Sequence, residues 1–200
     1  MSGGSMVMQE RAVRTRSALV RAAARAFDRN GYDGTSLSQI RAAAEMSMGA
    51  LTFHFATKGE LADAVQDEGW ILTEARVRDA LTPAGDPVDG LVALTLALAA
   101  LMEEEPMVRS AARLTRERAG GRAWTSAWRP AAHALIERAR ASGVLPPVAR
   151  PEVVADLVSH LIVGAEAQIR ASAADAGRPA VDVGGQLARI WDLVLLPVRG

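Results

Sequence analysis

A short polar stretch in the first third of the chain carries residue types that bind phosphate groups. Ser47 and Thr52 have hydroxyls, and Gly49 keeps the backbone bare between them. His54 adds an imidazole, and Lys58, the only lysine of the chain, adds an ammonium. Donors on a helix without bulk on its outer face can enter a major groove about 12 Å wide and contact phosphates, while contacts to base edges give sequence preference. The pattern favours binding of an anion over catalysis.

Two short helices are expected to position these residues. Thr35 or Ser36 supplies an N-cap for the first helix, and Ser47 supplies one for the second. Apolar residues recur in both helices at spacings of three and four, so one face of each turns inward. The inward residues are Leu37, Ile40 and Ala44 in the first helix and Leu51 and Phe55 in the second. This pattern describes a helix-turn-helix, although three small helices that pack only for stability fit it as well.

Almost every other segment also has helical periodicity, and no strand pattern is present. Asn30-Gly31 is suited to end the first helix, Pro106 separates two helices, and Pro197 is expected to end the last one. The expected helices cover about residues 10–29, 37–44, 48–55, 58–77, 91–105, 107–118, 126–141, 152–171 and 186–195. We therefore predict an all-α fold.

The composition suggests a folded protein of the cytoplasm. Half of the 200 residues are hydrophobic and none is cysteine, so neither a disulfide framework nor a thiolate metal site is expected. The longest apolar run, Leu91–Met102, is too short to cross a bilayer, and the N-terminal residues lack a signal-peptide core. We expect no membrane partner. Residues 1–60 carry eight basic and five acidic residues, which is a mild sign of a polyanionic partner.

An enzyme is the first alternative, and the sequence offers little for it. The histidines, His54, His133 and His160, lack metal-ligand spacing, and no nucleophile elbow or phosphate loop is present. The run Glu103–Glu105 points its carboxylates in different directions, which is typical of a solvated face. We expect no catalytic residue, no metal and no cofactor. The second alternative, a purely helical interaction module, would show no salt-dependent binding to the DNA upstream of its own gene.

The chain from about residue 14 to residue 65 resembles the N-terminal domain of the TetR family of bacterial repressors. The matching residues are Phe27, Gly31-Tyr32, Thr35-Ser36, Gly49-Ala50-Leu51, His54-Phe55 and Lys58. The resemblance implies a three-helix helix-turn-helix DNA-binding domain over residues 1–56. It also implies a helical ligand-binding and dimerisation domain over residues 57–200. Such a repressor would leave its double-stranded operator DNA when a small ligand binds.

By position, the resemblance implies a set of DNA contacts in and next to the two short helices. They are Ser36, Ser38, Gln39, Ser47, Met48, Gly49, Thr52, Phe53, His54 and Lys58. Three positions depart from the family pattern. Glu45 stands where the turn commonly has glycine, Met48 replaces a frequent lysine or arginine, and Thr52 replaces a tyrosine that reaches a phosphate.

The chain also resembles a narrower branch of the family, the γ-butyrolactone autoregulator receptors and their pseudo-receptor relatives, which control antibiotic synthesis. Trp128 in "SAWRP" matches the pocket tryptophan of that branch. The implied effector is a small lipophilic lactone, which needs a mostly apolar cavity with few donors. The candidate lining residues are Trp70, Leu94, Leu98, Met102, Met107, Ala111, Leu114, Trp124, Trp128 and Leu135. Arg113 or Arg116 would donate to the ring carbonyl.

Other readings of the larger domain stay open at this point. The protein could be a pseudo-receptor with no butyrolactone response, or a sensor of antibiotics or lipophilic cations that uses Glu117 near Trp124 and Trp128. The last two helices carry apolar stripes suited to a four-helix bundle between two subunits, which would form a homodimer. Packing of these stripes within one subunit is the alternative.

The departures at Met48 and Thr52 lead to a prediction about operator binding. Each lost cationic contact weakens binding and flattens its salt dependence. We therefore expect Met48→Lys with Thr52→Tyr to raise operator affinity and steepen the dependence on salt, as measured by gel shift at several KCl concentrations. An unchanged affinity in the double variant would contradict this interpretation of the two positions.

Overall fold

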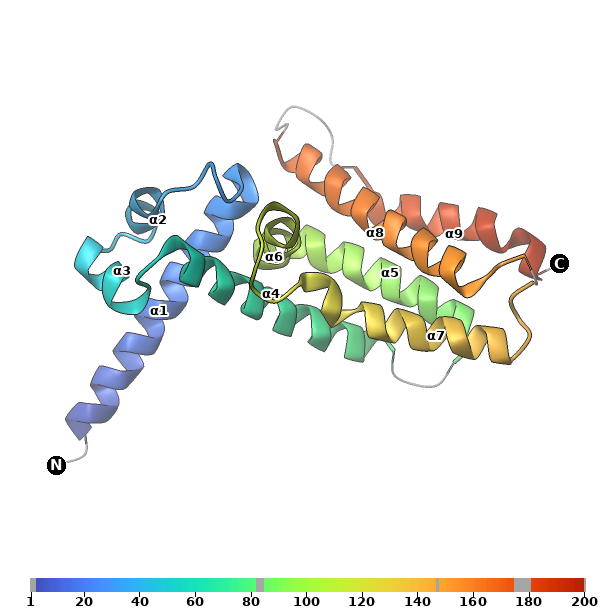
Figure 1. Cartoon of the computed structure of the whole chain (residues 1–200), viewed down its shortest axis with the longest axis horizontal. Helices are drawn as coiled ribbons and strands as arrows, with labels where there is room; N and C mark the ends of the chain where they lie inside the picture. Colours follow the sequence, from blue (N-terminus) through green and yellow to red (C-terminus); the bar gives the residue numbers. More distant parts are fainter. Residues whose placement is uncertain (1–2, 82–84, 147, 175–180, 200) are drawn as a thin grey trace. The chain divides into compact units, whose positions relative to one another are not determined.

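The computed structural model describes residues 3–81, 85–146, 148–174 and 181–199, and all regular structure in these ranges is helical (Figure 1). The predicted all-α class is confirmed. The elements are α1 (Gly3–Asn30), α2 (Leu37–Ala43), α3 (Met48–His54), α4 (Lys58–Ala80), α5 (Pro87–Glu104), α6 (Pro106–Glu117), the 3-10 turn η1 (Trp124–Ala127), α7 (Arg129–Ala141), α8 (Pro151–Ala174) and α9 (Val183–Arg199).

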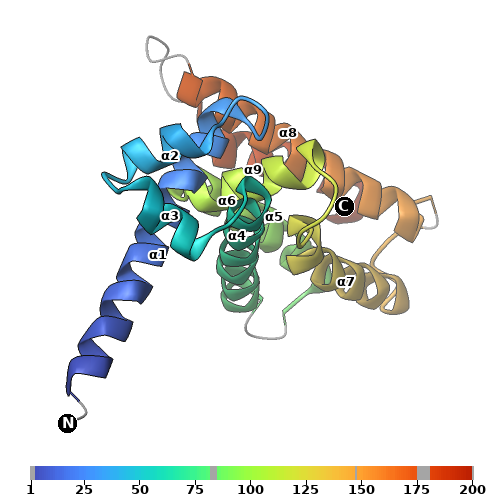
Figure 2. The ribbon, with the colours of Figure 1, turned by 60° about the vertical axis from the view of Figure 1, so that its left-hand side comes forward.

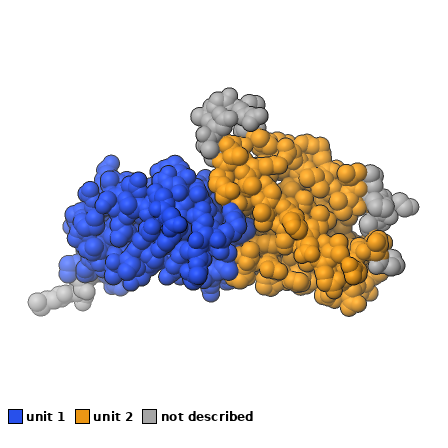
Figure 3. All heavy atoms as spheres, turned by 45° about the horizontal axis from the view of Figure 1, so that its top comes forward, with its two compact units in different colours: residues 1–70, 106–124 blue, residues 71–105, 125–200 orange. Residues whose placement is uncertain are grey.

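These helices form two compact units, which Figure 3 shows in different colours. Unit 1 consists of residues 1–70 and 106–124, and unit 2 of residues 71–105 and 125–200. The division falls within α4, and it groups α6 with the first three helices although α6 comes much later in the chain. The predicted boundary between residues 56 and 57 separates regions by function, and it stays a prediction.

A single apolar cluster holds unit 1 together. Leu19 and Phe27 of α1 are fully buried in it, and α6 contributes Leu114. The residues predicted to face inward from the two short helices lie in or against this cluster: Ile40, Leu51 and Phe55 within it, and Leu37 and Ala44 packed onto it. Both views of the ribbon show α2 and α3 alongside α1 (Figures 1 and 2). Because isolated helices of seven residues are unstable in water, α2 and α3 depend on this burial.

In unit 2, α5 packs against α7, α8 and α9. A buried hydrogen bond fixes α9 on α5, because the indole N–H of Trp191 donates to Thr95 Oγ1 over 2.7 Å. The Thr95 hydroxyl in turn donates to the Val92 carbonyl over 2.9 Å. Both buried polar groups therefore have partners, as a close-packed apolar interior requires.

Three helices differ from the predicted bounds by four residues or more at one end. α1 begins at Gly3 rather than near residue 10, because no proline interrupts the preceding residues. α5 begins at Pro87, since the Asp86 carboxylate accepts from the Val88 N–H (2.8 Å) and caps the helix. α9 runs to Arg199, so its predicted end at Pro197 is wrong. A proline removes only its own amide donor, and one missing bond in a last turn is tolerated. Residues 82–84, between α4 and α5, lie outside the described residues.

Candidate nucleic-acid interface

A capping box sets the start of α2. The Gln39 N–H donates to Ser36 Oγ over 3.2 Å, and the Ser36 N–H donates to Gln39 Oε1 over 2.8 Å. Ile40, the next residue along α2, is fully buried. Ser36 and Gln39 therefore define where α2 begins and how it is turned, and they leave Ser38 exposed beside them.

α3 packs its inner face against the core of unit 1 and exposes its outer face to solvent. Ser47 Oγ accepts the Ala50 N–H over 3.1 Å and caps the first turn. Leu51 is fully buried and Phe55, the C-cap residue, is 4% exposed. On the outer side the Phe53 ring is 81% exposed. The sequence-predicted division of this helix into an inner and an outer face is confirmed.

Gly49 has no internal reason to be glycine. A Cβ built on it would meet nothing within 4 Å, and the residue lies exposed in the first turn of α3. Alanine favours a helix over glycine by about 1 kcal/mol. The packing of the described residues therefore does not require a glycine at position 49, and the backbone there stays open to solvent.

The ten predicted DNA-contact residues lie in unit 1, and eight of them are open to solvent. Exposed are Ser36, Ser38, Gln39, Ser47, Met48, Gly49, Thr52 and Phe53, and half-buried are His54 and Lys58. The Phe53 and His54 rings meet edge to face, with centroids 5.1 Å apart. Thr52 Oγ1 lies 3.0 Å from the Met48 carbonyl and 3.3 Å from that of Gly49, so its proton stays within the helix while its lone pairs face outward.

Lys58 has an internal role that the sequence did not reveal. Its ammonium donates to the carbonyls of Tyr32 (2.9 Å) and Thr35 (3.1 Å), and it lies 4.2 Å from the centre of the Tyr32 ring. Thr35 Oγ1 closes the same turn by donating to the Gly31 carbonyl over 2.7 Å. Lys58 thus ties the start of α4 to the turn between α1 and α2 through contacts far apart in sequence.

α6 binds the same turn with charged residues. Arg109 forms a salt bridge with Asp28 at the end of α1, at 2.8 Å. Arg113 donates to the Asp28 carbonyl over 2.9 Å, and Glu117 accepts the Tyr32 N–H over 2.7 Å. The spacing of four residues along α6 places these side chains on one face. These contacts explain why α6 belongs to unit 1.

The Glu117 carboxylate is committed to this network. Burial by itself raises the pKa of Glu117, but hydrogen bonds from Arg113 and the Tyr32 N–H, together with two arginine charges, lower it overall. The contact therefore contributes stability above the ordinary pKa of a glutamate and loses it as the pH falls through the lowered value. Its ion pair with Arg113 lies within α6. Glu117 is thus bound internally, which does not favour its proposed use for a cationic ligand.

The predicted ligand-lining residues fall in both units. Trp70, Met107, Ala111, Leu114 and Trp124 lie in unit 1, and Leu94, Leu98, Met102, Trp128 and Leu135 lie in unit 2. All are buried except Trp70, which is half-buried with the Arg122 guanidinium 3.9 Å from its ring centre. Met107 and Leu114 belong to the core cluster of unit 1. A role for these ten residues in ligand binding stays a prediction.

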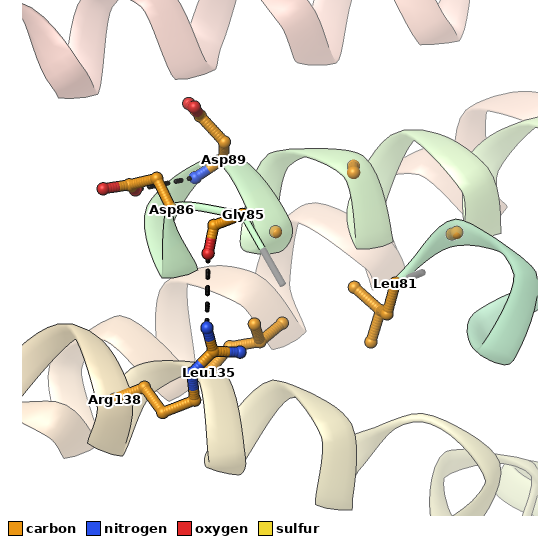
Figure 4. Close-up of a pocket in the computed structure, with 9 residues that line it drawn as sticks. Leu81, Gly85, Asp86, Asp89, Leu135 and Arg138 are labelled. Carbon is orange, nitrogen blue, oxygen red and sulfur yellow. Dashed lines mark hydrogen bonds between the residues drawn. The ribbon is translucent and has the colours of Figure 1, made fainter. Parts of the chain in front are cut away.

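An open cavity of about 190 Å³ lies in unit 2 (Figure 4). The residues around it come from the end of α4, the start of α5 and α7: Ala80, Leu81, Gly85, Asp86, Asp89, Gly90, Ala93, Leu135 and Arg138. Arg138 closes one side by donating to the Gly85 carbonyl over 3.2 Å. Of the predicted lining residues, this cavity includes Leu135.

Two classes of site are missing from the part of the chain that the structure describes. It contains no group of three or more histidines, cysteines or carboxylates that could hold a metal ion. The described helices also include none that is long and apolar enough to span a bilayer.

The two short capped helices α2 and α3, with the outer face of α3 exposed, form a helix-turn-helix. Residues 19–65 match the family model of bacterial regulatory proteins, tetR family. The chain is 32% identical over 193 residues to the A-factor receptor protein of Streptomyces griseus, covering 95% of this chain and 66% of that protein. The chain belongs to the TetR family, whose members are regulators and not enzymes. It spans about two thirds of the length of this curated relative.

Solved structures agree with the assignment. CprB of Streptomyces coelicolor, in complex with its biological operator sequence, is 27% identical to this chain with a TM-score of 0.75. The matched region covers 92% of this chain and 88% of the CprB chain. A γ-butyrolactone receptor described as ArpA-like is 25% identical to this chain with a TM-score of 0.69. The matched region covers 90% of this chain and 98% of the receptor chain. The resemblance to butyrolactone receptors predicted from the sequence is thereby confirmed.

The turn between α2 and α3 contains a strained residue. Glu45, which stands where the family pattern commonly has glycine, has a φ of 55°, in the left-handed region. For a residue with a Cβ this conformation costs roughly 1–2 kcal/mol.

We expect Glu45→Gly to raise the free energy of unfolding by about 1 kcal/mol, because glycine adopts this φ without steric cost. Urea denaturation measures the change. The matched control is Glu45→Gln, which removes the same charge and keeps the strain, and it should leave the stability nearly unchanged. An equal gain in both variants would assign the effect to charge instead of backbone strain.

Proposed function

We propose that this chain is a ligand-responsive repressor that binds operator DNA through α2 and α3 as a homodimer in the cytoplasm. A small lipophilic effector of the γ-butyrolactone type would release it. The observation that carries the proposal is the bare outer side of α3 at Gly49, where a Cβ would meet nothing within 4 Å. A helix with this opening is suited to lie close to a duplex. The similarity to the A-factor receptor and to an operator-bound relative supports the same function.

The proposed division of labour on the DNA follows from what each side chain already does. Ser36, Gln39 and Ser47 cap helices and would present their remaining lone pairs and donors to phosphates. Phe53 and Met48 would contact base edges, since both are exposed and apolar on the outer side of α3. Lys58 would use only the donor that its two internal hydrogen bonds leave.

A homodimer through α8 and α9 is supported by the apolar side chains on their outer sides. Within unit 2, Val154, Ala165 and Leu187 of the predicted stripes are buried. Outward of them, Val163 is 51% exposed and Leu193 is 68% exposed. A second copy of the chain would bury these residues, and exposed apolar patches on proteins often mark such interfaces. Two recognition helices on successive major grooves must lie about 34–36 Å apart, which a twofold dimer provides.

The effector proposal is supported mainly by the buried tryptophan at the start of α7. Trp128 is 2% exposed and precedes a helix whose Leu135 lines the cavity of unit 2. A buried indole is suited to a lactone with an alkyl tail. The internal commitment of Glu117 favours a neutral effector over a lipophilic cation.

The test of the DNA proposal is Gly49→Ala. We expect this variant to fold with equal or higher stability, because alanine favours a helix and has room. Its affinity for the DNA upstream of its own gene should nevertheless fall by at least tenfold, because the added methyl group keeps α3 away from the groove. A gel shift against Ala50→Gly, the reverse change at the neighbouring position, measures the effect. Unchanged affinity in Gly49→Ala would contradict the proposed docking.

The test of the effector proposal is Trp128→Ala. We expect the variant to bind DNA with unchanged affinity and to lose release by butyrolactone extracts, as followed by gel shift with and without extract. Trp191→Phe is the matched control, since Trp191 is equally buried in unit 2 but bonded to Thr95. Normal release of the Trp128→Ala variant would remove Trp128 from the effector site. A wild-type protein that binds DNA but ignores every extract would be a pseudo-receptor.

A further inference from the structure

Positive charge is scarce on the outer side of the helix-turn-helix. Between residues 36 and 58 the basic side chains are Arg41, His54 and Lys58. Arg41 donates to the Met46 carbonyl over 3.4 Å, and the Lys58 ammonium donates to two carbonyls. α3 itself therefore offers an anion only the imidazole of His54. A duplex-binding surface needs more than this, because neutralisation of phosphates supplies a large part of the affinity.

Arg16 of α1 provides a cation at the C-terminal end of α3. Its guanidinium carbon lies 5.1 Å from the centre of the Phe55 ring, and Phe55 is the C-cap of α3. The Arg16 residue is exposed, and among the described residues it forms no salt bridge. A guanidinium beside an aromatic ring is held in place and can still direct a planar fork of donors at a phosphate.

The position of Arg16 also answers an electrostatic problem of α3. The last carbonyls of a helix carry partial negative charge, which repels a phosphate. A cation at that end offsets the repulsion. Glu68 of α4 is a nearby acid: burial raises its pKa, and the charges of Arg16 and Arg21 oppose the rise without cancelling it. Glu68 is half-buried and makes no ion pair with Arg16 in the described structure, and Arg16 itself is exposed.

We propose that Arg16 is a phosphate-contact residue that holds the sugar–phosphate backbone at the C-terminal end of α3. This inference rests on the proposed DNA binding and extends it to a residue outside the helix-turn-helix. Arg16 supplies there the cationic contact that Met48 does not supply within α3.

The test measures how the affinity for the protein's own upstream DNA depends on salt. Each phosphate contact contributes about 0.9 to the slope of log affinity against log salt concentration. Arg16→Gln should therefore lower the slope by about 2 in a dimer, and reduce the affinity at low salt on the order of tenfold. Fluorescence anisotropy of a labelled duplex at several KCl concentrations gives both values, and circular dichroism checks that the variant folds. Arg16→Lys should keep most of the slope, because it keeps the charge.

Arg25→Gln is the matched control. Arg25 is also exposed on α1. It lies nine positions after Arg16, which is about two and a half helical turns, so it faces away from Phe55. Its slope should equal that of the wild type. An equal fall in both variants would assign the effect to overall charge, and no fall in Arg16→Gln would exclude the contact; either result overturns the inference. If the wild type binds no duplex at low salt, the proposed function itself fails.

Discussion

Burial of a few side chains from two short helices is the constraint on which this structure depends. α2 and α3 have seven residues each, too few to be helical alone in water. They persist because Ile40 and Leu51 are fully buried against α1 in the core of unit 1. The inner side of α3 is used in this way. The outer side is left with Gly49, polar groups and the exposed side chains of Met48 and Phe53, and this is the surface that DNA would meet.

The turn between α1 and α2 receives bonds from two elements that lie far along the chain. Lys58 at the start of α4 donates to its carbonyls, and Glu117 at the end of α6 accepts its Tyr32 N–H. The same turn leads into Ser36, the cap of α2. The DNA-facing helices are therefore held by α4 and α6 as well as by α1, and the contacts are directional hydrogen bonds in addition to apolar packing.

The sequence predicts features set within one helical turn, but it does not reveal contacts between residues that lie far apart in the chain. The caps at Ser36 and Ser47 and the inward face of α3 follow from spacing within one turn of helix, so they could be predicted. The inward role of Lys58 and the membership of α6 in unit 1 depend on partners dozens of residues away, which no local pattern encodes. Arg16 was missed for the same reason, since only the fold brings it to Phe55. The position of Glu45 was noticed as unusual, but its left-handed φ required coordinates.

The tight seam between α4 and α6 restricts how unit 1 can respond to a signal. A Cβ at Gly69 would lie 2.5 Å from that of Ala111 and 3.0 Å from the Met107 carbonyl oxygen, so the two helices approach closely there and only the Ala111 methyl group lies between them. Helices packed this closely move as one rigid body, because interlocked surfaces shift between discrete arrangements instead of deforming gradually. Any displacement that reaches α6 must carry the first half of α4 with it. We therefore expect α6 and the first half of α4 to move together within unit 1.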